Sequence, residues 1–121
     1  MLPATARLTN SREFRSVTRR GRRAGRSRLV VHALRDESVT EGPARAGFVV
    51  SKAVGNSVVR HRVTRQLRHL VRDRIDRLPP GTQLVVRALP AAAGSRSSAL
   101  AADLDSALDR LRLPGSRTGE S

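Results

Sequence analysis

The chain is short, strongly basic and almost free of aromatic residues. Its 121 residues include 24 Lys or Arg and 10 Asp or Glu, which gives a formal net charge of +14 and a pI of about 12.0. This length suffices for one domain with one modest hydrophobic core. So large a charge destabilises a compact chain by self-repulsion, and it therefore indicates a polyanionic partner.

Several classes of protein are excluded by composition. The absence of cysteine excludes a disulfide framework, a thiolate zinc site and a thiol nucleophile. No apolar run approaches the roughly 20 residues of a membrane-spanning helix, and the N-terminus lacks the apolar stretch of a signal peptide. A hydrophobic fraction of 38% is too high for a wholly disordered basic tail. We therefore expect a folded, cytoplasmic, polyanion-binding domain without membrane contact.

The first half of the chain predicts one helix and two strands. Residues 1–9 are expected to form a flexible arm, followed by a helix from Asn10 to Arg20 with Phe14 and Val17 facing inward. Asn10 and Glu13 have the spacing of a capping box. Strands are predicted over 29–34 and 46–51, and a third, shorter strand is expected either in the basic loop 19–28 or in 51–55. The acidic segment 35–44 is expected to be a solvent-exposed loop.

The second half predicts two helices around one strand. Asn56 or Ser57 caps a long helix, whose apolar residues recur at intervals of three and four: Val59, Val63, Leu67, Leu70, Val71, Ile75 and Leu78. A strand over 83–89, a connector over 91–96 and a helix over 100–111 follow. The expected organisation is one α+β domain over residues 10–112, with one sheet covered by helices, and a disordered tail over 113–121.

The positive charge gathers in two segments. With Val63 toward the core, the outer face of the long helix carries a row of cations flanked by Arg60 and Arg62, namely His61, Arg65, Arg68 and Arg72. Residues 12–28 contain eight arginines and a single acid, Glu13. Most charged helix faces are simply solvated, but cations at the positive end of a helix dipole favour a bound polyanion.

Structured RNA is favoured over duplex DNA, because strands separate the first two helices and exclude a helix-turn-helix arrangement. Phe14 is interpreted either as a base-stacking residue or as a core residue. The histidines lack metal-ligand spacing, and no convergent carboxylate set of the nuclease type is present. Asp73 and Asp76 are explained by ion pairs along their helix, while Asp103, Asp105 and Asp109 are expected on the solvent face of the last helix. No catalytic residue is predicted.

Residues 47–68 resemble the signature of bacterial ribonuclease P protein subunits. The matching features are a strand ending in Ser51-Lys52, the turn Val54-Gly55-Asn56, and a helix that opens with Arg60-His61-Arg62 and continues through Arg65 to Arg68. Arg7-Leu8, Glu13-Phe14 and Gly21 resemble the family's N-terminal pattern, and residues 85–88 resemble its last strand. The similarity covers roughly residues 7–112.

The resemblance implies an αβββαβα domain with a left-handed β-α-β crossover, a topology shared with a ribosomal-protein domain. It also implies a ribonucleoprotein in which a catalytic RNA, with Mg²⁺ held mainly by RNA and substrate, removes the 5′ leader of precursor tRNA. No obligate protein partner is implied. The RNA-facing residues by position are Lys52, Asn56, Arg60, His61, Arg62, Arg65 and Arg68. A leader cleft would contain Arg12, Phe14, Arg15, Val17, Thr18 and His32.

The chain departs from the family pattern at four positions. His61 stands where the family has Asn, Thr64 replaces a basic residue, and Thr18 and His32 occupy places where relatives often have aromatic residues. These departures imply weaker stacking on the leader and a larger contribution from arginine. The alternative hypotheses are a structural ribosomal protein, a stand-alone nuclease and a DNA-binding regulator.

Overall fold

The computed structural model describes residues 6–8 and 10–111, which form three α-helices and a four-stranded mixed sheet. In chain order the elements are α1 Ser11–Arg20, β1 Arg22–Gly25, β2 Leu29–Arg35, β3 Arg45–Val49, α2 Ser57–Ile75, β4 Thr82–Ala88, the short 3₁₀ helix η2 Pro90–Ala92 and α3 Ser97–Leu111. The predicted α+β class and the αβββαβα element order are confirmed.

The sheet has the strand order β1-β2-β4-β3. Its β1–β2 and β2–β4 pairs are antiparallel, whereas β3 and β4 are parallel and are joined through α2 as a β-α-β unit. Both predicted helix caps are present: Asn10 Oδ1 accepts a hydrogen bond from the Glu13 N–H at 2.8 Å, and Asn56 Oδ1 accepts one from the Val59 N–H at 3.0 Å.

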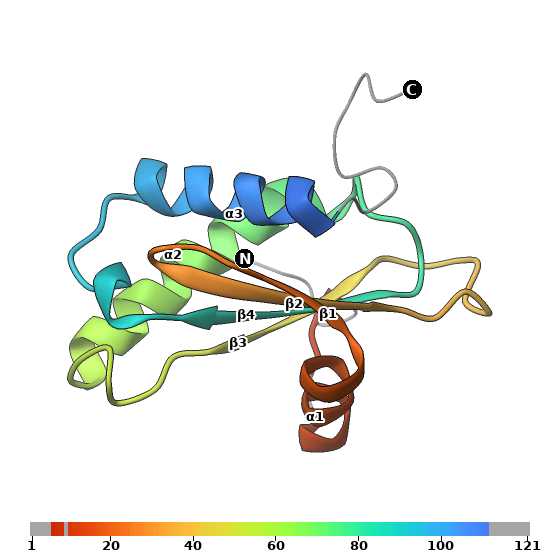
Figure 1. The fold of residues 1–121 in the computed structure, drawn as a ribbon, viewed down its shortest axis with the longest axis horizontal. Coiled ribbons are helices and arrows are strands. Elements are labelled where there is room, and N and C mark those ends of the chain that lie inside the picture. Colours follow the sequence, from red (N-terminus) through yellow and green to blue (C-terminus); the bar gives the residue numbers. More distant parts are fainter. Residues whose placement is uncertain (1–5, 9, 112–121) are drawn as a thin grey trace.

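The sheet separates two hydrophobic layers. Because successive strand residues point to opposite faces, Leu84 and Val86 of β4 pack against α2 and α3, while Val85 packs against α1. Figure 1 shows α3 and α1 on opposite sides of the sheet. The predicted stripe of α2 is buried at Val63, Leu67, Val71 and Ile75.

The layer beneath α1 is much the smaller of the two. Its buried members are Leu8, Val17 and Val85, and three partly buried residues pack against them, namely Phe14, Leu34 and Val49. The larger layer contains the buried apolar residues of α2, α3 and the other face of the sheet. Few apolar contacts therefore hold α1 in place.

The structure decides one expectation for the N-terminal third and corrects another. The third, shorter strand lies in the basic loop and not in 51–55: Arg22–Gly25 form the edge strand β1, whose one apolar side chain, Ala24, is buried. Residues 6–8 are not a flexible arm, because Leu8 is buried and its N–H donates to the Ala46 carbonyl at 2.9 Å. The remainder of the predicted arm, residues 1–5 and 9, and the predicted tail lie outside the described residues.

Two aspartates of α3 have partners that the sequence did not indicate. Asp103 accepts a hydrogen bond from the Arg28 N–H at 3.0 Å, and the Asp105 carboxylate binds the Arg74 guanidinium at 2.5 and 3.0 Å. The expected place on the solvent face is confirmed for Asp105, which is exposed, and is wrong for Asp103, whose side chain is only 15% exposed. The two residues tie α3 to α2 and to the β1–β2 hairpin, respectively. Among the described residues, no helix is long and apolar enough to span a membrane.

Candidate nucleic-acid interface

The outer face of α2 carries the first group of cations. His61, Arg65, Arg68 and His69 line a shallow groove of about 390 Å³, opposite the buried stripe. The first turn of the helix contains no acidic residue, so the partial positive charge of the helix end adds to that of the side chains. Asp73 lies 3.7 Å from Arg72 in an exposed pair of little energetic weight.

The turn before α2 supplies the remaining predicted RNA-facing residues. Lys52 and Arg62 are exposed, as expected for residues that bind a large partner. Asn56 and Arg60 also have local roles, because Asn56 caps the helix and the Arg60 Nε donates to the Gly55 carbonyl at 3.2 Å. The turn residues and the outer face of α2 thus form one cationic surface, which we call the α2 surface and which comprises Lys52, Asn56, Arg60, His61, Arg62, Arg65, Arg68 and His69.

A second group of cations lies on α1. Arg12, Arg15, Ser16, Arg19 and Arg20 line a groove of about 480 Å³. Arg12, Arg15 and Arg19 are exposed and recur at helical spacing on the side opposite Val17, which is fully buried against the sheet. We call this outer side of the helix the α1 surface.

The predicted leader-cleft residues therefore do not all converge. Arg12 and Arg15 point away from the sheet, whereas Phe14 lies against it: a Cβ atom built on Gly47 would be 2.2 Å from the Phe14 Cζ. Phe14 is partly buried, so its ring packs against the sheet and also keeps an accessible edge. Val17 is fully buried and supports the helix without reaching solvent.

His32 lies on the α1 side of the sheet between two arginines. It is 8% exposed, pairs with Arg23 across β1 and β2, and is a diagonal neighbour of Arg87, which is opposite Val30. Burial, followed by the charges of Arg23 and Arg87, lowers the pKa of the His32 imidazole. Its Nδ1 is buried and has no hydrogen-bond partner within the described residues.

Arg23 and Arg87 were not among the predicted site residues, although both are exposed beside His32. Arg23 on β1 and Arg87 on β4 flank β2, and the positive charge of each acts on His32. Arg87 is the only charged residue of β4 and lies between two buried apolar residues. This isolated charge was the sequence signal that could have marked Arg87 as a site residue. The strip formed by Arg23, His32 and Arg87 adds positive charge to the sheet beside α1. Thr18, another predicted leader-cleft residue, lies on α1 and is partly buried.

The ion pairs of the described residues leave most of these surface arginines unneutralised. In the described part of the chain, ion pairs join Arg28 to Asp103, Arg45 to Glu13, Arg72 to Asp73 and Arg74 to Asp105. None of these pairs includes an arginine of the α1 surface, or Arg65 or Arg68 of the α2 surface. The molecule is thus a small, basic α+β protein with two separate cationic surfaces, one on each side of its sheet.

Comparison with known proteins identifies the family. A family model described as Ribonuclease P matches residues 2–112. The chain is 54% identical to the ribonuclease P protein component of Streptomyces griseus over 97% of this chain and 100% of that protein. It is also 54% identical to that of a Nocardioides species, over 92% of this chain and 95% of that protein. The chain belongs to the ribonuclease P protein family.

Solved structures support the same fold. A Staphylococcus aureus RNase P protein mutant with defective mRNA degradation activity superposes with a TM-score of 0.79 at 20% identity, covering 89% of each chain. The RNase P protein from Thermotoga maritima gives a TM-score of 0.71 at 22% identity, over 90% of this chain and 98% of that one. The fold is therefore retained where most of the sequence differs.

Proposed function

We propose that this chain is the protein subunit of a ribonuclease P holoenzyme whose catalytic RNA removes the 5′ leader from precursor tRNA. In this proposal the α2 surface binds the catalytic RNA, and the α1 surface with the strip at Arg23, His32 and Arg87 binds the leader. The protein lowers the repulsion between two polyanions, and it favours precursor over mature tRNA because only the precursor has a leader.

The observation that carries the proposal is the presence of two cationic surfaces on opposite sides of one sheet. Two such surfaces suit a protein that contacts two RNA segments at once. Arginine-rich surfaces bind RNA largely through phosphates, and stacking on Phe14 adds contact with an unpaired base. The described ion pairs leave the arginines of the α1 surface available for this role.

The proposal assigns Mg²⁺ to the RNA subunit and the substrate. Among residues 6–8 and 10–111, no three His, Asp or Glu side chains come together as a metal-binding group. Glu13, Asp103 and Asp105 bind arginines instead. We therefore assign the protein's own residues to binding and orientation, and no chemical step to a metal held by the protein.

Single-turnover cleavage of a 5′-labelled precursor tRNA by bacterial ribonuclease P RNA tests the proposal. The reaction is run at low Mg²⁺ with and without the protein, together with a protein-only control. We expect acceleration only when RNA and protein are both present, and we expect Arg65→Ala to weaken assembly with the RNA. An unchanged RNA rate would favour a structural ribosomal protein, and cleavage by the protein alone would reveal a nuclease site in the chain.

A further inference from the structure

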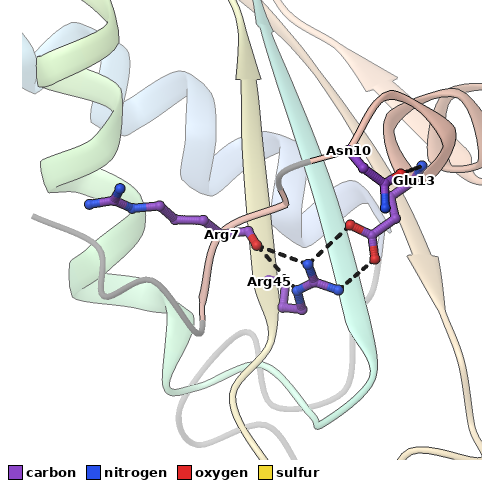
Figure 2. Close-up of polar contacts among 4 residues, drawn as sticks. All are labelled: Arg7, Asn10, Glu13 and Arg45. Carbon is purple, nitrogen blue, oxygen red and sulfur yellow. Dashed lines mark hydrogen bonds and ion pairs between the residues drawn. The ribbon is translucent and has the colours of Figure 1, made fainter.

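Arg45, at the start of β3, joins three separate pieces of the chain. Its Nη1 and Nη2 donate to the two carboxylate oxygens of Glu13 on α1 at 2.6 and 3.0 Å. Its Nε and Nη2 donate to the Arg7 carbonyl at 3.2 and 3.0 Å. Figure 2 shows this arrangement, with the Arg45 guanidinium between the Glu13 carboxylate and the Arg7 carbonyl.

These contacts require a guanidinium group. Its planar fork binds a carboxylate with two parallel hydrogen bonds and still presents N–H groups to a carbonyl, which a lysine ammonium cannot do in the same geometry. The Arg45 and Glu13 side chains are 33% and 24% exposed, so solvent screens the pair less than a fully exposed one. Glu13 is thus held by β3, and the capping box predicted for it has only its Asn10 half.

The pair is important for α1 because that helix has little other anchorage. Among the described residues, the buried apolar side chains of the layer beneath it are Leu8, Val17 and Val85. Arg45 and Gly47 lie on the same face of β3, and they meet the adjacent α1 residues Glu13 and Phe14, respectively. The helix is therefore fixed on the sheet edge at two neighbouring points, one ionic and one apolar.

We propose that Arg45 is a positioning residue that sets the orientation of the α1 surface relative to the sheet, and thereby the preference for RNA that carries a 5′ leader. This inference rests on the proposed function. Arg45 itself contacts protein groups, and it acts on the leader through the placement of Arg12, Arg15 and Phe14. The α2 surface lies on the other side of the sheet and does not depend on this contact.

Arg45→Gln and Glu13→Gln test the inference in the reconstituted holoenzyme. The measurement is the ratio of dissociation constants for mature tRNA and for precursor tRNA, together with the affinity of the protein for the catalytic RNA. We expect each variant to lower the ratio by roughly fivefold, because a less firmly held α1 presents Arg12, Arg15 and Phe14 in the binding orientation only part of the time. Affinity for the catalytic RNA should stay within about twofold of wild type.

Asp105→Asn is the matched control. It removes a second bidentate pair, Arg74–Asp105, which joins α2 to α3 at 2.5 and 3.0 Å, away from α1. This variant should lower the thermal stability of the protein as Glu13→Gln does, but it should leave the precursor preference unchanged. The double exchange Glu13→Arg with Arg45→Glu re-forms the ion pair in reverse but loses the hydrogen bonds to the Arg7 carbonyl, because a carboxylate cannot donate to it. It should therefore restore part of the preference that each single exchange removes.

Each outcome bears on one claim. A wild-type holoenzyme without precursor preference would overturn the proposed function itself. A wild-type preference that survives in Arg45→Gln and Glu13→Gln would overturn the positioning role alone. An equal loss of preference in Asp105→Asn would attribute the effect to general stability, and it would also overturn the positioning role. Loss of preference limited to the Arg45 and Glu13 variants, with partial recovery in the double exchange, supports the positioning role.

Discussion

The contact between Gly47 and Phe14 allows a sharp test of how α1 lies on the sheet. In Gly47→Ala, the added Cβ would lie 2.2 Å from the Cζ and 2.6 Å from the Cε1 of Phe14, closer than any real packing contact. The ring must move. Because the atoms concerned are at the far end of a partly buried side chain, the ring can swing toward solvent, and the cost is limited to the packing that Phe14 loses.

The expected changes in unfolding free energy follow from the packing that Phe14 loses. Complete burial makes Phe→Ala cost about 3–5 kcal/mol, so a half-buried ring should cost about 2 kcal/mol in Phe14→Ala. Gly47→Ala should cost about 1–2 kcal/mol, the range of an overpacked contact that can partly relax. In the double variant the methyl group occupies space that the ring has left, so its cost should approach that of Phe14→Ala alone. The coupling energy should then be about 1 kcal/mol or more.

Urea unfolding of the free protein measures all three variants, provided that the slope of unfolding free energy against urea stays constant. Gly25→Ala is the control, because a Cβ there would meet only the Val30 side chain at 4.0 Å. It should change stability by less than about 0.5 kcal/mol. Additive costs for Gly47→Ala and Phe14→Ala, within about 0.5 kcal/mol, would refute the packing of Phe14 on Gly47.

Two further predictions concern His32 and the turn glycines. Burial and the charges of Arg23 and Arg87 lower the pKa of His32 from 6.5. The folded protein therefore binds fewer protons than the unfolded chain near and below pH 6.5, and it loses stability as the pH falls there. Between about pH 7.5 and about pH 5.5, wild type should lose more unfolding free energy than His32→Gln; equal losses would contradict this assignment. Gly81 has a φ of +84°, and a Cβ there would be 2.2 Å from the Asp36 carbonyl oxygen, whereas Gly94, with a φ of +75°, has open space. Gly81→Ala should therefore cost at least about 2 kcal/mol and Gly94→Ala about 1 kcal/mol in thermal unfolding, and equal costs would count against the turn geometry.

The long helix and the central strands could be predicted because their signals are local. Val63, Leu67 and Val71 recur at helical spacing, and all three are buried. The edge strand β1 has no such signal: Arg22–Gly25 include one apolar side chain, and the segment becomes a strand because it pairs with β2. Tertiary pairing outweighed local composition there.

The candidate site was predictable only in part, for a similar reason. The motif from Lys52 to Arg68 lies in one continuous segment, so its cationic face could be derived from helical spacing and from the family resemblance. The contact of Arg45 with Glu13 joins residues 32 positions apart, and that of Arg28 with Asp103 joins residues 75 positions apart. No sequence period brings such pairs together, and only the sheet register places Arg23 and Arg87 beside His32.

The distribution of acids explains how so basic a chain keeps an ordered surface. Glu13, Asp103 and Asp105 each bind an arginine from a distant part of the chain, so they stabilise the fold where they remove positive charge. In the described part of the chain, no such pair neutralises the arginines of the α1 surface, and these repel one another in the free protein. Bound phosphates relieve that repulsion, so RNA binding should also stabilise the fold by mass action. Arg45 binds Glu13 inside the protein, whereas Arg65 lies on the exposed α2 surface, so removal of Arg45 should change leader preference and removal of Arg65 should change assembly with the catalytic RNA.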